Sequence, residues 1–320
     1  MPVRKVEEEL GRLGALRDAP ESEAAAALAK ALDHRVNVVV AKAAATCGER
    51  GLRGLIPNLL LAFSRLLEHA AQRDPQCWGK HAIARALVAL DHRESAPYLR
   101  GSRHVQMEPV CGGQADTAAN LRGTCVLALA ACSDIPRADT LRAMVDALAD
   151  PAGLVRAEAV RALTQMPGDE AALLLRLKAR LGDKELQVAG QVFDGLLALE
   201  AESAVGFVAG FLKDADEAVC AEAALSLGSS RLAGPVETLI ACWKETRDLE
   251  LRRAALQGLA VSRQEPALDF LLALVKDGSA REACSAIEAL SVHRDSEEIR
   301  KRVAAAAVGR EPEVRAALKW

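Results

Sequence analysis

The sequence predicts an all-α fold, a superhelix (solenoid) of about eight stacked two-helix repeats. Three observations point to it. A leucine recurs at a nearly constant interval along most of the chain. Hydrophobic residues make up 51% of the 320 residues while aromatic residues make up only 3%, so Ala and Leu supply the bulk, which suits closely packed helices. No run of alternating β-branched residues appears, so we expect no sheet.

The repeat is clearest when the segments are aligned on one position, here called the slot. The slot residues are Lys80, Arg122, Arg156, Ala189, Cys220, Arg252, Ala283 and Arg315. Successive slots are separated by 42, 34, 33, 31, 32, 31 and 32 residues. Seven residues after each of the first seven slots stands a leucine: Leu87, Leu129, Leu163, Leu196, Leu227, Leu259 and Leu290. In a helix, positions three and seven residues after the slot share one face, which predicts a buried stripe.

A second feature of the repeat is an acidic residue six positions before the slot. It is present as Asp74, Asp116, Asp150, Asp183 and Asp214. An Asp at this place is expected at or near the N-cap of the slot helix, where its carboxylate accepts backbone N–H groups. Amphipathic stretches such as PALDFLLALVKDG predict a second helix in each unit.

The pattern D-x5-R-x2-A-x2-AL resembles HEAT repeats, most closely the short HEAT-like repeats of phycobilisome lyases, over roughly residues 20–318. The resemblance implies a ladder of Asp and Arg side chains between successive repeats. We assign it to Asp116, Arg122, Asp150 and Arg156, with Asp74 and Lys80 as a weaker version. The ladder is interrupted where the slot is Ala189, Cys220 or Ala283.

One repeat domain is expected to span residues 1–320. Residues 1–47 form an N-terminal cap and a degenerate first repeat, and residues 295–320 form a C-terminal cap. The 42-residue step holds about ten residues more than its neighbours, which predicts an inserted loop over residues 101–120.

The inserted loop is the main candidate site, because long loops in tightly packed repeat proteins often carry function. The candidate binding residues are Trp78, His81, Arg85, His104, Gln106, Glu108, Cys111 and Asp116. Three readings stay open: an ordered loop that covers an edge, a ligand or partner site, or a metal site built from His81, His104, Glu108 and Cys111. A Cys111–His104 nucleophile pair is a weaker alternative.

We expect the loop to fold back on the protein. Val105, Met107 and Val110 would anchor it, because apolar side chains are costly to leave in water. Trp78, His81 and Arg85 are the expected opposing surface, one helix earlier, and His81 and Arg85 share one face of that helix.

Composition argues against several classes of function. A net charge of −3 and few aromatic residues disfavour a nucleic-acid groove, including that of a HEAT-like DNA glycosylase. No membrane-spanning run or secretory signal is apparent, and the eight cysteines form no CxxC pair, so we expect a cytoplasmic protein with free thiols. No catalytic residue, metal or cofactor is assigned. The expected function is a non-catalytic scaffold that binds a protein partner on its concave face; the alternative is a small-molecule or chromophore-handling protein that uses the loop.

Overall fold

The computed structural model describes residues 3–318, and these form twenty α-helices, four short 3₁₀ helices and one β-hairpin. The chain divides into two compact units, Met1–Met166 and Pro167–Trp320. The predicted all-α class is confirmed, with the hairpin as its exception. The expectation of a single repeat domain stays a prediction.

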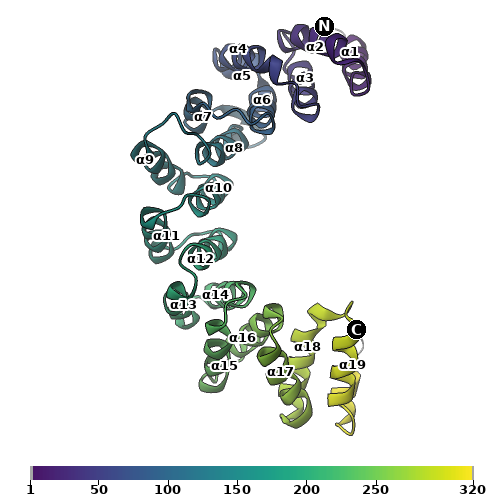
Figure 1. Ribbon diagram of the computed structural model, residues 1–320, viewed down its shortest axis with the longest axis vertical. Helices are drawn as coiled ribbons and strands as arrows, with labels where there is room; N and C mark the ends of the chain where they lie inside the picture. The colour runs from purple at the N-terminus through teal and green to yellow at the C-terminus, as the bar shows by residue number, and fades with distance from the viewer. Residues whose placement is uncertain (1–2, 319–320) are drawn as a thin grey trace. The chain divides into compact units, whose positions relative to one another are not determined.

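The first unit contains ten α-helices and both strands. Its helices are α1 (Val3–Ala15), α2 (Glu21–Leu32), α3 (Asn37–Glu49), α4 (Ile56–Leu67), α5 (Ala70–Arg73), α6 (Trp78–Ala89), α7 (Ser95–Ser102), α8 (Ala119–Leu129), α9 (Arg137–Leu148) and α10 (Gly153–Thr164). The short 3₁₀ helices are η1 (Arg53–Leu55) and η2 (Pro75–Cys77). Helices α3, α6, α8 and α10 pack in sequence to form one row, and α4, α7 and α9 lie in the other (Figure 1).

The described residues of the second unit, 167–318, repeat this arrangement without a hairpin. Its helices are α11 (Asp169–Leu181), α12 (Leu186–Glu200), α13 (Glu202–Ala209), α14 (Glu217–Ser229), α15 (Gly234–Glu245), α16 (Leu249–Ser262), α17 (Glu265–Asp277), α18 (Ala280–Leu290), α19 (Glu297–Ala306) and α20 (Pro312–Ala316), with η3 (Gly210–Lys213) and η4 (Ser291–His293). Helices α12, α14, α16 and α18 pack in sequence, and α15 and α17 flank them (Figure 1).

The slot helices are α6, α8, α10, α12, α14, α16, α18 and α20, and they carry the core of each unit. All seven leucines of the register are fully buried, each with 0% exposure. The apolar positions three residues after the slot are just as inaccessible, as at Cys125, Ala159 and Ala223. Because a fully buried leucine contributes about 1.5–3 kcal/mol of transfer free energy, this stripe is a major source of stability.

Small residues let neighbouring slot helices approach closely. A Cβ atom built on Gly228 of α14 would lie only 2.0 Å from the carbonyl oxygen of Gly258 in α16. No side chain fits such a gap, so glycine is required where these two helices touch.

Arginine side chains close the C-terminal ends of helices in the preceding repeat. Arg310 donates to the carbonyl oxygens of Val275, Lys276 and Gly278 at 2.7, 2.7 and 2.6 Å. The last carbonyls of a helix have no partner within it, and a cation at this end also favours the helix dipole.

The aspartates that precede the slots sit slightly before the expected N-caps. Asp116, Asp150, Asp183 and Asp214 each accept the backbone N–H two residues later, at 2.9–3.0 Å. They therefore shape the turn that leads into the helix rather than cap it. Asp74 differs, since its carboxylate accepts the N–H groups of Gly79 and Lys80 inside α6, at 2.8 and 2.9 Å.

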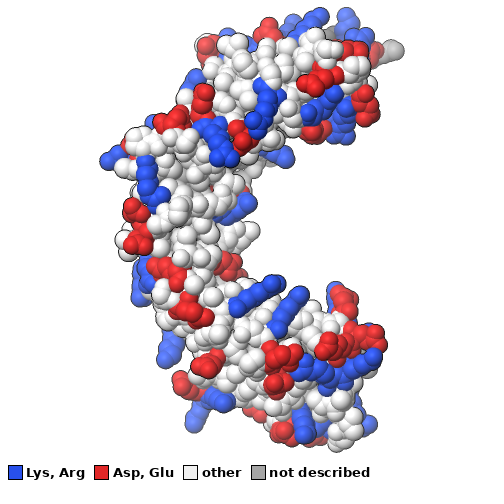
Figure 2. Space-filling view, in the orientation of Figure 1, with Lys and Arg blue, Asp and Glu red and all other residues white. Residues whose placement is uncertain are grey.

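Among residues 3–318, no helix is long and apolar enough to cross a membrane. Acidic and basic side chains are interspersed on the face shown in Figure 2, without a large field of one sign.

Candidate functional site

The inserted segment is a two-stranded antiparallel hairpin, which corrects the expectation of no sheet. Strand β1 (Met107–Val110) pairs with β2 (Gly113–Asp116) in a register that sets Met107 opposite Asp116 and Val110 opposite Gly113. Cys111 and Gly112 form the turn, and Gly112 has a φ of +89°, which glycine adopts without strain. At the open end the N–H of Thr117 donates to the carbonyl oxygen of Gln106 at 2.9 Å. The side chains of such a hairpin alternate between two faces.

The inward face of the hairpin is polar. Gln106 and Glu108 point toward the start of α6 and are only 3% and 6% exposed. Buried polar groups must find hydrogen-bond partners, because an unpaired one typically costs about 1–3 kcal/mol. The partners of these two side chains therefore show how the hairpin is held.

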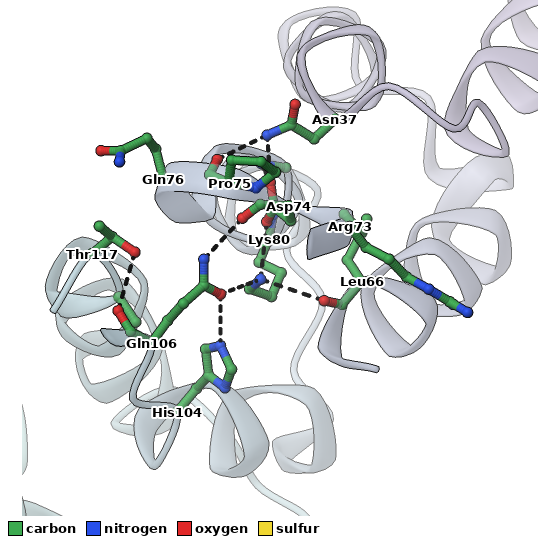
Figure 3. Close-up of polar contacts among 12 residues, drawn as sticks. Asn37, Leu66, Arg73, Asp74, Pro75, Gln76, Lys80, His104, Gln106 and Thr117 are labelled. Atoms are coloured by element: carbon green, nitrogen blue, oxygen red, sulfur yellow. Dashed lines mark hydrogen bonds and ion pairs between the residues drawn. The ribbon is translucent and has the colours of Figure 1, made fainter. Parts of the chain in front are cut away.

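Lys80 is the innermost cation of this contact. Its side chain and that of Asp74 are both 0% exposed, and Nζ lies 3.1 Å from Asp74 Oδ2. Nζ also donates to Gln106 Oε1 at 2.8 Å and to the carbonyl oxygen of Leu66 at 3.4 Å. Figure 3 shows Lys80 between Asp74, Leu66 and the hairpin. A charge buried this completely is stable only when it is paired and hydrogen-bonded, as it is here.

Gln106 joins the hairpin to this ion pair. Its Oε1 accepts from Lys80 and lies 3.2 Å from His104 Nε2, while its Nε2 donates to the carbonyl oxygen of Asp74 at 2.9 Å and to Glu108. Figure 3 shows the amide of Gln106 pointing at these groups. Both ends of the amide are thus fully used, which fixes the position of β1 on α6.

Glu108 forms the second anchor. Its carboxylate accepts the backbone N–H of Gln76 at 2.8 and 3.0 Å, the side-chain amide of Gln76 at 3.1 Å and the hydroxyl of Thr117 at 2.9 Å. Burial acts to raise the pKa of Glu108, but the hydrogen bonds from Gln106, Thr117 and Gln76 outweigh it and hold that pKa below the ordinary value. The carboxylate is therefore charged at neutral pH.

A second ion-pair cluster continues from the base of the hairpin. Arg122 of α8 pairs with Asp116, and its Nε and Nη2 donate to Asp150 at 2.8 and 2.9 Å. Burial lowers the pKa of Arg122, but its hydrogen bonds to Asp150 and Asp116 outweigh this effect and raise the pKa overall. Arg156 donates to the carbonyl oxygens of Asp150 and Pro151 at 2.8 and 3.0 Å. The four residues assigned to the ladder thus lie in one chain of contacts.

The hairpin is consequently anchored by polar groups, and the predicted apolar anchors are wrong. Val105, Met107 and Val110 are 60%, 49% and 43% exposed. The alternation of the strand explains two of the three: once Gln106 and Glu108 face inward, Val105 and Met107 must face outward. Val110 lies on the same side as Glu108, but it is exposed at the turn end of the hairpin, where it pairs with Gly113.

A hollow lies beside the outward face. Val105, Met107 and Asp116 border it on the hairpin side, and Ala143 and Ala147 of α9 border it on the other. It has a volume of about 510 Å³, with Arg122 and Asp150 also in its lining. The exposed sides of Val105 and Met107 and this hollow are called the hairpin surface below.

The predicted site residues fall in two places. His104, Gln106, Glu108 and Asp116 come together at the hairpin. Trp78, His81 and Arg85 instead belong to α6, where Trp78 is 55% exposed and Arg85 borders a separate hollow of about 440 Å³ with Val88 and Leu127. The inward-facing side chains of the hairpin bind Asp74, Gln76 and Lys80, so the expected opposing surface is corrected to the segment that leads into α6 and to Lys80 in its first turn.

Neither the Cys111–His104 pair nor a metal site with Cys111 as a ligand is formed. Cys111 is exposed in the turn, while the Nε2 of His104 contacts Gln106 at the other end of the hairpin. Burial lowers the pKa of His104 below its ordinary value, so its ring is mainly neutral at pH 7. Within residues 3–318, no three His, Cys, Asp or Glu side chains are grouped so that they could hold a metal ion. The alternatives of a metal site and of a Cys–His pair are therefore wrong for the described residues.

Three residues that hold the hairpin in place were not among the predicted site residues. Asn37 donates to Asp74 Oδ1 at 2.9 Å and to the carbonyl oxygen of Pro75 at 2.9 Å, and Gln76 and Thr117 hold Glu108. Asp74 and Lys80 carried a signal, because they occupy the Asp and slot positions of the repeat. Asn37, Gln76 and Thr117 carry no pattern that distinguishes them from surface residues.

Comparison with known proteins supports the type of repeat. Residues 204–291 match the family model described as HEAT repeats. This segment of the chain therefore consists of HEAT repeats. This confirms the resemblance inferred from the register, and the matched HEAT segment includes the slots Cys220, Arg252 and Ala283. No curated protein matches the chain.

Several solved structures resemble the chain at a low level. Human deoxyhypusine hydroxylase in complex with glycerol is 20% identical over 89% of each chain, with a TM-score of 0.32. The CpcE–CpcF complex of phycocyanin lyase from Nostoc is 18% identical over 76% of this chain and 92% of that one, with a TM-score of 0.38. The S. pombe condensin Cnd3–Cnd2 subcomplex is 19% identical over 78% of this chain and 35% of that one, with a TM-score of 0.43. At these values none of the three assigns an activity to this chain.

Proposed function

We propose that the protein is a non-catalytic binding scaffold and that the hairpin surface of the first unit binds a protein partner. One observation carries the proposal: the hairpin is locked in place by buried polar groups, and this arrangement leaves Val105 and Met107 exposed beside a hollow of about 510 Å³. Apolar side chains held rigidly in water are typical of interaction sites, because little conformational entropy is lost when a partner covers them.

The rim of the hairpin surface favours a polypeptide partner with both charges. Arg103 and Asp146 border the same hollow, one cationic and one anionic. An apolar centre with a polar rim is the usual anatomy of a protein interface. The concave face expected for the stacked repeats stays a prediction as a second contact area, and the cytoplasmic location stays a prediction too.

The test uses the intact chain as bait in native lysate, compared with Met107→Glu and with a deletion of residues 104–118. Leu61→Glu is the matched control, because Leu61 is 72% exposed on α4 and does not line the hollow at the hairpin surface. We expect a captured protein that is lost with Met107→Glu and kept with Leu61→Glu. Equal capture by both variants would refute the hairpin surface as the contact, provided that circular dichroism shows both are folded.

A small molecule is the second candidate, and the size of the hollow favours it. Ligand pockets commonly measure roughly 300–1,000 Å³, and the hollow at the hairpin surface lies in this range. Titration with candidate pigments, followed by tryptophan fluorescence, tests this function. Saturable quenching that Met107→Glu abolishes would support it, and unsaturable quenching would exclude it.

A further inference from the structure

A row of exposed leucines runs along α11 in the second unit. Leu173, Leu177 and Leu181 are 62%, 56% and 75% exposed. They are spaced four residues apart, so they lie one above the other on the same side of the helix. The opposite side of α11 is the one that packs into the unit, through residues such as Leu175 and Ala179. α11 therefore has a second apolar face, called the leucine row below.

Single exposed leucines are ordinary on protein surfaces, but a contiguous row is not. Elsewhere in the part of the chain that the structure describes, exposed leucines such as Leu61 and Leu249 do not recur at helical spacing within their helices. The leucine row thus needs a partner surface that is apolar, narrow and about as long as two helical turns.

We propose that the leucine row binds the leucine row of a second copy of this chain, with the two α11 helices antiparallel about a twofold axis at Leu177. This arrangement sets Leu177 against Leu177 and Leu173 against Leu181, so every leucine meets a leucine. A twofold contact must be complementary to itself, and this row satisfies that condition. Because both copies present a ridge of residues four apart, the helices are expected to cross at about −50°.

The charges on α11 favour the same occupant and the same direction. The first turn is acidic, with Asp169 and Glu170. In the basic last turn, Lys178 is already paired with Asp183 at 2.7 Å, so Arg180 is the exposed cation of this end. Antiparallel pairing brings the acidic end of one copy toward the basic end of the other, and it also opposes the two helix dipoles. Parallel pairing would place like charges together.

The surroundings of Leu181 offer a place for the far end of the partner helix. A hollow of about 260 Å³ opens there, lined by Leu181, Phe193 and Phe211 on one side and by the carboxylates of Asp183, Asp214 and Asp216 on the other. The guanidinium of Arg180 lies 4.8 Å from the ring centre of Phe207 beside it. In the antiparallel dimer Leu173 of the second copy lies at the apolar side of this hollow, next to Leu181 and Arg180.

The contact is small. Stable interfaces usually bury about 1,200–2,000 Å², which one pair of short helices does not reach. The proposal therefore specifies a weak dimer that forms and dissociates with concentration.

Sedimentation velocity on the full chain, from low-micromolar to sub-millimolar concentration, tests the proposal. We expect the wild-type protein to shift from monomer to dimer, Leu177→Glu to stay monomeric, and Leu61→Glu to dimerise like the wild type. A monomeric wild-type protein throughout the range would overturn the proposal, and so would a Leu177→Glu variant that dimerises like the wild type.

A crosslink tests the geometry independently of affinity. In a Cys111→Ser background, Leu177→Cys should give a disulfide-linked dimer on mild oxidation, because the twofold axis brings the two introduced thiols together, whereas Leu61→Cys should not. Equal crosslinking at both positions would contradict the assigned axis. The leucine row shares no residue with the hairpin surface, so neither result bears on the proposed function.

Discussion

Replacing Lys80 with Met tests the central contact of the hairpin anchor. The change removes the buried charge and keeps most of the side-chain volume. Asp74 then loses its cation in a site where both side chains are 0% exposed. Gln106 Oε1 also loses its donor at 2.8 Å. Breaking a buried ion pair on one side typically costs about 3–5 kcal/mol, because the remaining charge is left uncompensated.

The geometry places the expected loss at the lower end of this range. Asp74 still accepts N–H groups from Gly79 at 2.8 Å, from the backbone of residue 80 at 2.9 Å and from Asn37 at 2.9 Å. These donors stabilise the carboxylate without its cation, so we expect the free energy of unfolding of the first unit to fall by about 3 kcal/mol.

Urea unfolding followed by fluorescence measures the effect. Trp78 is the only tryptophan of the first unit, so a Trp243→Phe, Trp320→Phe background reports that unit alone. Arg53→Met is the control, because the Arg53–Asp91 pair is solvent-exposed and such pairs contribute little to stability. If Lys80→Met and Arg53→Met lower the unfolding free energy equally, the anchor is not the stabilising contact argued here.

Three further outcomes are expected. Leu227→Ala should lower the free energy of unfolding of the second unit by about 2–5 kcal/mol in urea titrations, because Leu227 is 0% exposed in the middle of the register. Gly228→Ala should lower the midpoint of thermal unfolding, because the added Cβ would lie 2.0 Å from the carbonyl oxygen of Gly258. Gly206→Ala is the control: nothing lies within 4 Å of its added Cβ, so the change should raise the free energy of unfolding by about 0.5–1 kcal/mol. His104→Gln should weaken the loss of stability as the pH falls below about 6.5, because burial lowers the pKa of His104 and the unfolded chain then binds the proton more readily.

A specific result would contradict each of these three predictions. An unchanged urea midpoint for Leu227→Ala would contradict the register. Equal thermal shifts for the two glycine variants would contradict the close approach of α14 and α16. The carboxylates of Glu108 and Asp116 have lowered pKa values, so their stabilising effect is lost only in more acidic solution. A His104→Gln profile identical to the wild type between about pH 7 and about pH 5 would show that His104 does not titrate in the anchor.

The repeats were predictable because each helix carries its own signal. Leu163, Leu196 and Leu227 mark the buried face at fixed distances from their slots, and the same spacing yields their complete burial. Local periodicity is sufficient to predict the buried face of a helix when that face packs against the equivalent helix of the next repeat.

The hairpin was not predictable as a sheet, and its physical basis explains why. A strand is recognised by apolar residues alternating with polar ones, with the apolar set buried. Here the alternation is inverted: Gln106 and Glu108 form the buried set, and Val105 and Met107 the exposed one. The partners that make this burial favourable lie about thirty residues earlier, at Gln76 and Lys80. The sequence of the hairpin contains no pattern that predicts these two contacts.

The inserted hairpin also explains why Lys80 stands where the next two repeats have arginine, Arg122 and Arg156. Arg122 reaches two carboxylates, that of Asp116 in its own repeat and that of Asp150 in the next. Lys80 reaches Asp74 in its own repeat, but its second partner is Gln106 of the insertion. Gln106 thus takes the place of the next acidic rung, and one negative charge fewer needs to be balanced at that point. A compact ammonium, which donates in three directions, suits a site closed by Asp74, Gln106 and the carbonyl oxygen of Leu66, whereas the broad fork of a guanidinium suits paired carboxylates. The insertion therefore does not interrupt the ladder, because the uncharged amide of Gln106 takes the position of the next carboxylate beside Lys80. The same hydrogen bond holds the hairpin on α6, and this makes the hairpin surface rigid.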